Sequence, residues 1–270
     1  MLIVIGVILM ALAVGMFIAR NSQQNKLLQI KSVETSQIKD LQELARQVAA
    51  EMGAGSFNQI AEVKGRCECE SPLTSELAKV PCVYYKMQVS REYEETYWRT
   101  DANGYSHQET RRGSDIVASN IRHVPFYVND GTGRIKLLPE GAEFIADKVF
   151  SQFQSGEVSG PRLSLGNLSF DLSLFRPTSG TRTLGYRYEE EAIQPGKDLY
   201  ILGEAADSSG ELAIQKPAQK KNKFIISTKS EEELIRSTSC NTVLLLVGSI
   251  ISVAVGIALI LLSVFNVIEV

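Results

Sequence analysis

Four cysteines and two histidines are the residues of this 270-residue chain best suited to metal chemistry. Cys67 and Cys69 are separated by one residue, Cys82 stands alone, and His107 and His123 show no paired spacing. A structural zinc site takes four ligands, usually as two closely spaced pairs. The spacing therefore favours buried thiols, and we expect no metal and no other cofactor.

The turn Asp130-Gly131-Thr132-Gly133 is a second candidate for chemistry. An acid protease places Thr or Ser directly after the aspartate, whereas Gly131 intervenes here, so a hairpin turn is the favoured interpretation. The chain has no G-x-S-x-G elbow, no phosphate-binding glycine loop and no H-E-x-x-H motif. The two histidines leave a Ser-His-Asp triad possible in principle, but no feature of the sequence identifies a particular triad. We leave catalysis uncertain and favour a non-catalytic role.

Acidic and aromatic residues are mixed in the segment Glu92–Trp98. Tyrosine and tryptophan anchor many protein interfaces. We therefore name Tyr93, Tyr97 and Trp98 as a candidate partner surface. The alternative is a solvated strand with one packed face.

The composition excludes several classes of protein. Hydrophobic residues make up 44% of the chain and charged residues 22%, which excludes a disordered chain. All 28 basic residues and 30 of the 31 acidic residues lie between Arg20 and Arg236. This near balance argues against a nucleic-acid binder, and four cysteines are too few for a disulfide-dense scaffold.

Two uncharged apolar runs, Leu2–Ala19 and Val243–Phe265, predict membrane-spanning helices. The first is about 27 Å long as a helix, close to the ~30 Å hydrocarbon core of a bilayer. A cleaved signal peptide would need a basic region before the apolar run, and only Met1 precedes it. Basic residues flank both runs on the side of the central region, so the positive-inside rule places residues 20–241 in the cytoplasm and both termini on the opposite side.

The central region begins with a helical pattern and then turns to strands. Apolar residues recur at helical spacing over residues 22–52, which predicts a stalk or oligomerising helix, or a helix packed on its own domain. Ser230 followed by three glutamates predicts a helix start that continues into the second span. We also expect a short helix over Ala142–Phe150 and a loop over Gln152–Gly180.

Short strand-forming segments separated by turns fill the rest of the region. In Val83–Val89, alternation should turn Val83, Tyr85, Met87 and Val89 toward a barrel core, with Cys82, Tyr84, Lys86 and Gln88 on the other face. The expected strands are Ala61–Gly65, Val83–Val89, Glu92–Thr100, Thr110–Ser119, Val124–Val128, Arg134–Leu138, Leu184–Glu191, Asp198–Ala205, Glu211–Gln215 and Lys223–Ser227.

Many short strands without βαβ alternation predict a membrane-anchored α+β chain that is mainly β. We expect a small OB-like barrel or sandwich between two transmembrane helices. The predicted organisation is a transmembrane helix (1–20), a helical stalk (21–55), a β-rich domain (56–229), a juxtamembrane helix (230–241) and a second transmembrane helix (242–268).

Several stretches of the chain resemble one family. They are Glu70–Ser75 followed by Pro81–Tyr85, Pro125-Phe126 followed by Asp130–Gly133, Tyr200–Ala205, and Phe224–Ser227. Together they are similar to the GIDE domain, also called the "beside a membrane" (BAM) domain, over roughly residues 1–265. The family includes a mitochondrial-anchored E3 ubiquitin ligase, a chloroplast-envelope relative and bacterial proteins. The motif positions, which we interpret as structural, are Ser71, Pro72, Leu73, Pro81, Cys82, Tyr84, Tyr85, Asp130, Thr132 and Gly133.

In the organelle ligases a RING domain with eight Cys/His zinc ligands follows the second span. The chain stops five residues after Phe265, and its four cysteines and two histidines cannot supply eight ligands. The resemblance therefore implies a ligase-like chain that lacks the RING. It also implies an intermembrane-space domain, whereas the basic flanks indicate a cytoplasmic one.

These observations favour a two-span membrane protein whose β-rich domain is a membrane-tethered binding or scaffolding module. The alternative is a RING-type E3 ubiquitin transferase-like protein that acts as an accessory to a separate catalytic chain. We expect contact with the lipid bilayer and with a membrane or cytoplasmic protein, leave homo-oligomers open, and expect no nucleic acid.

Overall fold

The computed structural model describes residues 2–100, 104–156, 162–165, 168–171, 180–208 and 210–268. The helices are α1 (Leu2–Ser32), α2 (Ile38–Met52) and α3 (Glu231–Ile268). The strands are β1 (Asn58–Glu68), β2 (Leu73–Thr74), β3 (Pro81–Cys82), β4 (Tyr84–Thr100), β5 (Ser106–His123), β6 (Phe126–Asn129), β7 (Arg134–Leu137), β8 (Glu143–Ile145), β9 (Asp147–Ser155), β10 (Arg162–Leu165), β11 (Leu168–Asp171), β12 (Thr181–Ile193), β13 (Asp198–Ala206), β14 (Ala213–Gln215) and β15 (Ile225–Ser227).

Five of the strands close into a small barrel. They pair in the order β1-β6-β7-β14-β13, and β13 pairs back onto β1. The β7–β14 pair is parallel and the other four pairs are antiparallel. The expected mainly β chain with a small barrel is therefore confirmed at this level.

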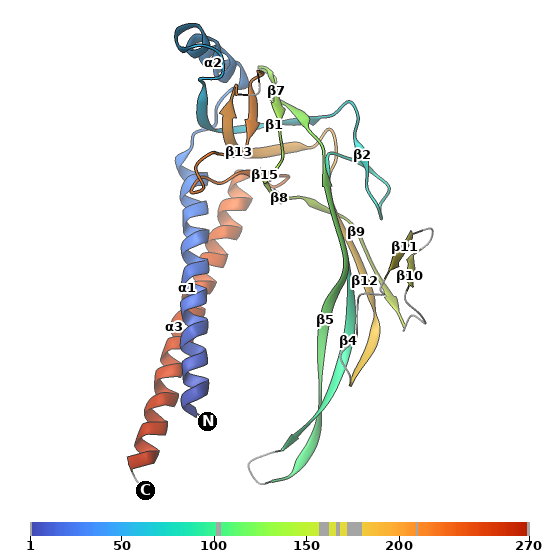
Figure 1. Cartoon of the computed structure of the whole chain (residues 1–270), viewed down its shortest axis with the longest axis vertical. Helices are drawn as coiled ribbons and strands as arrows, with labels where there is room; N and C mark the ends of the chain where they lie inside the picture. The colour runs from blue at the N-terminus through green and yellow to red at the C-terminus, as the bar shows by residue number, and fades with distance from the viewer. Residues whose placement is uncertain are drawn as a thin grey trace.

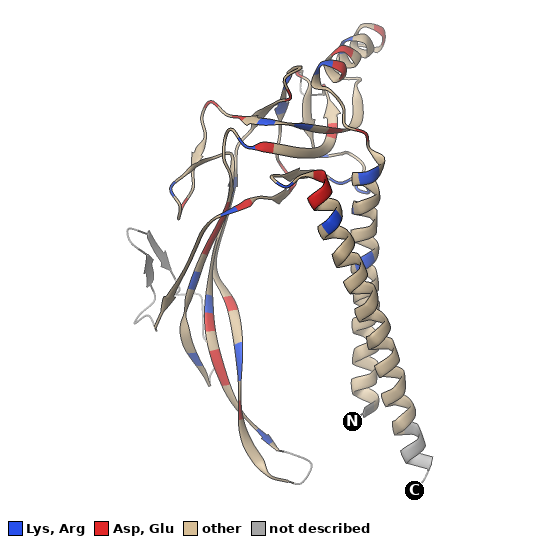
Figure 2. Ribbon diagram, turned by 180° about the vertical axis from the view of Figure 1, so that it is seen from behind, with Lys and Arg blue, Asp and Glu red and all other residues tan. Residues whose placement is uncertain are grey.

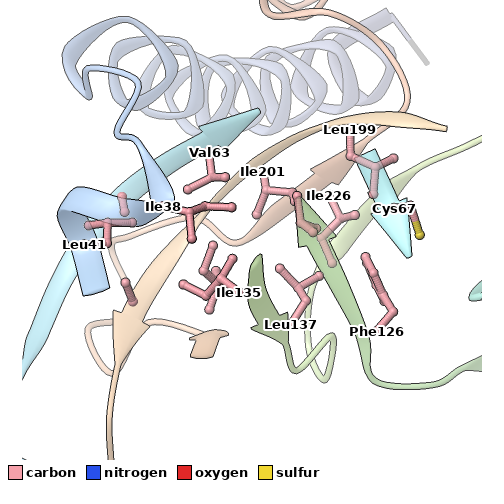
Figure 3. Close-up of a cluster of buried hydrophobic side chains, with 14 of the residues drawn as sticks. Ile38, Leu41, Val63, Cys67, Phe126, Ile135, Leu137, Leu199, Ile201 and Ile226 are labelled. Atoms are coloured by element: carbon pink, nitrogen blue, oxygen red, sulfur yellow. The ribbon is translucent and has the colours of Figure 1, made fainter. Parts of the chain in front are cut away.

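The barrel is filled by apolar side chains from alternate positions of its strands. Val63 and Ile201 are direct partners across β1 and β13, and both are fully buried. Figure 3 shows them pointing toward Ile135 and Leu137 from β7, with Ile38 of α2 beside them. Burying such side chains stabilises a domain by about 1.5–3 kcal/mol each.

A second sheet grows out of the barrel. Its order is β5-β4-β12-β9, and all of its pairs are antiparallel. The β4–β5 hairpin is inserted between barrel strands β1 and β6, and β9 and β12 lie between β7 and β13. Figure 1 shows this sheet extending from the barrel in the same direction as the pair formed by α1 and α3.

Helices α1 and α3 pack against each other along their apolar lengths. A Cβ atom added at Gly6 would lie 2.9 Å from the carbonyl oxygen of Gly256, so glycine permits the close approach there. Two helices, Ile3–Ser32 and Glu231–Ser263, are long and apolar enough to cross a bilayer by length and composition. Both chain ends lie at the same end of the pair (Figure 1).

Three expectations need correction. Residues 22–52 do not form one helix, because the chain leaves α1 at Ser32, forms a bridge between Thr35 and Glu62, and restarts at Ile38. Ala142–Phe150 is not a helix: it forms β8, which pairs in parallel with β15, and the start of β9. Gln152–Gly180 contains the end of β9 together with β10 and β11, and the remaining part of it lies outside the described residues.

The faces of the strand that follows Pro81 also differ from expectation. Val83 and Tyr84 both belong to the barrel core. Tyr85, Met87 and Val89 face a separate cluster under the second sheet, and Cys82 joins them there. The alternation fails because β3 ends at Cys82 and β4 starts at Tyr84, with a bend at Val83 between them.

Candidate interaction surface

The β4–β5 hairpin ends in a two-stranded segment that we call the distal ribbon, formed by Glu92–Thr100 and Ser106–Ser114. Its register runs without a shift from Glu92 paired with Ser114 to Thr100 paired with Ser106. Strand β12 accompanies β4 only as far as Glu95, so the tip has two strands. The expected return arm at Thr110–Ser119 is confirmed as part of β5.

The three aromatic residues predicted as one partner surface lie on opposite faces of the ribbon. Side chains alternate along a strand, so Tyr93 and Tyr97 share one face and Trp98 lies on the other. We call the face with Tyr85, Tyr93 and Tyr97 the inner face, and the face with Lys86 and Trp98 the outer face. The structure therefore separates the predicted surface into two.

The two tyrosines of the distal ribbon, Tyr93 and Tyr97, are engaged within it. The Arg91 guanidinium lies 4.9 Å from the centre of the Tyr93 ring, and Tyr93 covers Gly113 on the neighbouring strand. The Tyr97 hydroxyl donates a hydrogen bond of 2.9 Å to Glu109. This bond, with a further one from His107, lowers the pKa of the Glu109 carboxyl. These two rings therefore stabilise the ribbon.

Charged side chains on the ribbon are paired across the strands. Arg111 Nε lies 2.6 Å from Glu95 on the inner face, and Arg112 Nε lies 3.2 Å from Glu94 on the outer face. Figure 2 shows the acidic and basic residues spread along this sheet, in contrast to the uncharged lower parts of the helices. Exposed pairs of this kind contribute little stability, but they keep the ribbon polar and soluble.

The outer face exposes apolar side chains that no ribbon contact covers. Trp98 is 71% exposed near the tip of the ribbon. Closer to the barrel, Ile116 and Ile121 of β5 are 61% and 56% exposed. They share the outer face because a β-bulge at Val117 shifts the register by one residue between them.

The motif segment around Ser71–Tyr85 is held against the inner face by one buried glutamate. Glu190 is fully buried, and its carboxylate accepts hydrogen bonds from the backbone N–H groups of Glu76, Leu77 and Ala78 at 2.8–3.0 Å. The Tyr85 hydroxyl donates to Glu76 at 3.3 Å. Tyr85 thus finds the hydrogen-bond partner that a buried tyrosine needs.

The other motif positions of this segment have structural surroundings. Pro81 pairs with Thr74 in the short β2–β3 hairpin, and Leu73 pairs with Cys82. The Tyr84 ring stacks on Phe144 with ring centres 3.8 Å apart. Ser71 and Pro72 are exposed ahead of this hairpin.

The turn at Asp130 holds the start of helix α2. One Asp130 oxygen accepts bonds from the backbone N–H groups of Thr132 and Gly133, and the other accepts from Ile38 N–H at 2.8 Å. Burial alone would raise the Asp130 pKa, but these hydrogen bonds outweigh it and hold the pKa below its ordinary value. A Cβ at Gly133 would meet Ile38 at 2.9 Å, so glycine lets α2 approach.

Comparison with known proteins places this architecture in a family. A family model described as "GIDE: E3 Ubiquitin ligase" matches residues 94–262, which is more than half of the chain. The chain belongs to the GIDE family. The match begins inside β4. It includes the Asp130 turn, whereas the Ser71–Tyr85 segment precedes the match and lies outside it.

Two curated relatives from Arabidopsis thaliana match a large part of this GIDE chain. "E3 ubiquitin-protein ligase SPL1" is 30% identical over 195 residues, which cover 70% of this chain and 51% of the relative. "E3 ubiquitin-protein ligase SP1" is 29% identical over 202 residues, which cover 74% and 53%. The chain spans about half the length of these relatives. No solved structure matches it.

The two buried cysteines of this GIDE chain lie in different clusters. Cys67 lies in the barrel core and Cys82 in the cluster under the second sheet. Burial raises the pKa of the Cys67 thiol to about 12 and that of Cys82 to about 11. Within the ranges that the structure describes, no three Cys, His, Asp or Glu side chains form a group that could hold a metal ion.

The sequence interpretation missed two buried glutamates. Besides Glu190, Glu62 is 1% exposed and accepts hydrogen bonds from the hydroxyls of Tyr200 at 2.9 Å and Thr35 at 2.6 Å. Burial and this carboxylate both raise the Tyr200 pKa. An acid between apolar neighbours, as in Ala61-Glu62-Val63, was the available signal for such a residue.

Proposed function

We propose that this GIDE chain is a two-span membrane protein whose β-rich domain binds a membrane-associated protein through the outer face of the distal ribbon. The observation that carries the proposal is Trp98. It is 71% exposed on a ribbon whose charged neighbours are paired with one another. Exposed tryptophan in such a setting is typical of an interface anchor.

The exposed apolar surface of α1 and α3 supports the membrane assignment. Phe17 and Ile18 of α1 are 56% and 65% exposed, and Leu244 of α3 is 70% exposed. A contiguous apolar surface of this extent needs lipid or protein around it. Figure 1 shows the second sheet running alongside α1 and α3 toward the chain ends, so a partner bound by its ribbon would lie beside the helices, which favours a membrane-associated partner.

The barrel supports an OB-like assignment within this proposal. Five strands in a closed Greek-key order, with one parallel pair between β7 and β14, agree with that class of barrel. The central region carries a small negative net charge, so we propose that this OB-like barrel does not bind nucleic acid.

The basic flanks of the two spans support a cytoplasmic domain, and this orientation can be tested by cysteine labelling. Cys67 and Cys82 are buried and their thiol pKa values are raised, so they are poor reporters. Glu140, whose side chain is 90% exposed and lies outside the ribbon, is a better position. With Cys69 and Cys240 replaced by serine, we expect Glu140→Cys to react with an impermeant maleimide only after lysis. Labelling in intact cells would contradict the orientation.

The binding proposal is tested by a pair of ribbon variants in the full chain, purified from membranes in mild detergent. Trp98→Ala should abolish co-purification of membrane-associated partners, because it removes the exposed ring. Tyr97→Phe is the matched control on the inner face, since it removes only the hydroxyl that donates to Glu109. The same partners in the Trp98→Ala and wild-type samples would refute the proposal.

The comparisons favour a second candidate function, an accessory role beside a separate ubiquitin-ligase chain. The family description and the printed names of both relatives refer to E3 ubiquitin ligases. The four cysteines and two histidines of this chain cannot form an eight-ligand zinc domain. We therefore expect the purified chain to contain no stoichiometric zinc and to discharge no ubiquitin from a charged conjugating enzyme. Discharge by the chain alone would make it a ligase in its own right.

A further inference from the structure

The second sheet has two open edges. Among the described strands, β5 has no partner beyond β4, and β9 has none beyond β12. An edge strand presents a row of backbone N–H and C=O groups that can pair with another strand. Proteins commonly protect such edges with charged residues or proline, so an uncharged stretch of edge strand identifies a candidate for pairing.

Each edge has an uncharged stretch toward the C-terminal end of its strand. On β5 the segment Ile116–Ile121 has no charged residue, although Asp115 and Arg122 flank it. On β9 the segment Val149–Ser155 has none. No proline interrupts either segment. A β-bulge lies in each, at Val117 on β5 and at Val149 on β9, so a further strand would pair on either side of the bulge and not in one unbroken ladder.

The two segments lie at the same level of the sheet. Ile116 is opposite Ser90 on β4, Ser90 is opposite Arg187 on β12, and Arg187 is opposite Phe153 on β9. Ile116 and Phe153 therefore end the same row, and both are exposed on the outer face, at 61% and 41%.

The next row repeats the arrangement. Ser119 on β5 is connected through Gln88 and Glu189 to Ser151 on β9. If a second copy continues the sheet at β5, its Phe153 would lie opposite Ile116 of the first copy and its Ser151 opposite Ser119. Both pairs would be on the outer face. Aromatic–β-branched pairs and Ser pairs of this type stabilise neighbouring strands.

Strand direction decides which edges can meet. Three successive antiparallel pairs separate β5 from β9, so these two strands run in opposite directions. A neighbour whose β9 pairs with β5 then forms an antiparallel ladder while its helices keep the direction of the first copy's helices. Pairing β5 with β5 in antiparallel fashion would turn the second copy's helices upside down, which two spans in one membrane forbid.

We propose that β5 of one copy pairs with β9 of a second copy through Ile116–Ile121 and Val149–Ser155. The contact joins two different edges, so each added copy offers the same free edge again and the sheet extends from copy to copy. The argument on strand direction rests on the two-span part of the proposed function. The binding of a partner at Trp98 does not enter it.

Mixed cysteine cross-linking tests the contact in native membranes. Two differently tagged chains, one with Ile116→Cys and one with Phe153→Cys, are co-expressed with Cys69 and Cys240 replaced by serine. We expect oxidation or a short bismaleimide to join unlike chains at least about tenfold more than like chains, since directly opposite Cβ atoms lie about 4.5–5.5 Å apart. Predominant linkage between two Ile116→Cys chains would overturn the proposal.

The face of the sheet provides the matched control. Against Ile116→Cys, cysteines at the outer-face positions Ser151 and Ser155 should also cross-link, because the register can shift by two residues without changing faces. Cysteines at the inner-face positions Gln152 and Gln154 should not. An intrachain pair, Gln88→Cys with Ser119→Cys, confirms that the reaction works. Formation of this intrachain bond without any interchain product would refute the contact.

A final pair of variants separates this inference from the proposed function. Ser119→Lys in the Ile116→Cys chain together with Ser151→Lys in the Phe153→Cys chain should abolish the interchain product, because like charges would then lie opposite each other, and should keep the Trp98-dependent co-purification. Trp98→Ala should have the opposite effects. If the interchain product survives in both variants, the β5–β9 contact is contradicted. If co-purification survives Trp98→Ala, only the proposed binding face is contradicted.

Discussion

The barrel end and the distal ribbon of this GIDE chain use acidic residues in opposite ways. Near the barrel, Glu62 and Glu190 are almost fully buried and accept hydrogen bonds from hydroxyl and backbone groups. On the ribbon, Glu94 and Glu95 pair with arginines of the opposite strand at the protein surface. A buried acceptor cannot be removed without leaving donors unpaired, whereas an exposed pair can be replaced by water.

This difference separates the part of the molecule that holds the fold from the part to which we assign partner recognition in our proposal. The motif segment lies against the second sheet at Glu190, while the Asp130 turn and the start of α3 adjoin barrel strands. The capping box at α3 belongs to the same end, where Ser230 and Glu233 exchange bonds of 3.3 and 3.1 Å. The network of the ribbon, in which Tyr97, Arg99 and His107 contact Glu109, is exposed to solvent, and a two-stranded hairpin is marginally stable by itself.

The largest loss of stability should follow Glu190→Ala. The variant removes the acceptor of three backbone N–H groups, one in a buried bond and two in part-buried ones. At about 1–3 kcal/mol for each unpaired donor, the free energy of unfolding should fall by about 5 kcal/mol. Its neighbour Glu189, paired with Lys148 at the surface, is the matched control, and Glu189→Ala should cost less than about 1 kcal/mol. Chemical denaturation that gives equal losses would contradict this contrast.

Tyr85→Ala should have the next largest effect. Tyr85 is 1% exposed in the cluster under the second sheet, so its truncation should cost about 3–5 kcal/mol. Lys86, one residue later on the outer face, should tolerate alanine within about 0.5 kcal/mol. If both variants unfold at the same denaturant concentration, the assignment of faces to β4 is wrong.

Asp130→Ala should give a smaller and pH-dependent loss. The carboxylate caps α2 at Ile38, and loss of a cap costs about 0.5–2 kcal/mol. Because the native pKa is lowered, this stabilisation is fully present above the ordinary aspartate range, near pH 4, and is lost as the pH falls through the native pKa. The difference between wild type and variant should therefore be constant from pH 7 to about pH 5 and shrink below it. A difference that grows toward low pH would have the wrong sign.

The smallest effect is expected on the ribbon itself. Arg111→Ala removes a fully exposed partner of Glu95, so the unfolding midpoint should not change measurably. The unfolding midpoint of Arg111→Ala should also equal that of the wild type when both are measured at high and at low salt. A clear loss of stability would mean that the ribbon contributes to the fold in the way the barrel end does.

The sequence predicted those features that depend on local pattern. The two apolar helices, the β4–β5 hairpin, the turn at Asp130 and the start of α3 follow from hydropathy, turn residues and capping residues. The faces of Tyr93, Tyr97 and Trp98 were also within reach, because strand alternation puts the first two on one side and the third on the other.

Features that depend on distant contacts were not predictable in this way. Glu143–Ile145 forms a strand only because β15, about 80 residues later, pairs with it. The helical pattern of residues 22–52 is interrupted because the backbone N–H of Ser36 donates to the backbone carbonyl of Glu62, far along the chain. The role of Glu190 depends on a loop more than 100 residues earlier. No local pattern contains these partners.

Photo-cross-linking tests the central claim, that recognition lies on the ribbon and not on the barrel. A photoreactive phenylalanine derivative would replace Trp98 on the ribbon or Arg66 on barrel strand β1, whose side chain is 66% exposed. In native membranes we expect a protein adduct at position 98 and none at position 66, although both positions are open to solvent. An adduct at position 66 without one at position 98 would contradict the account.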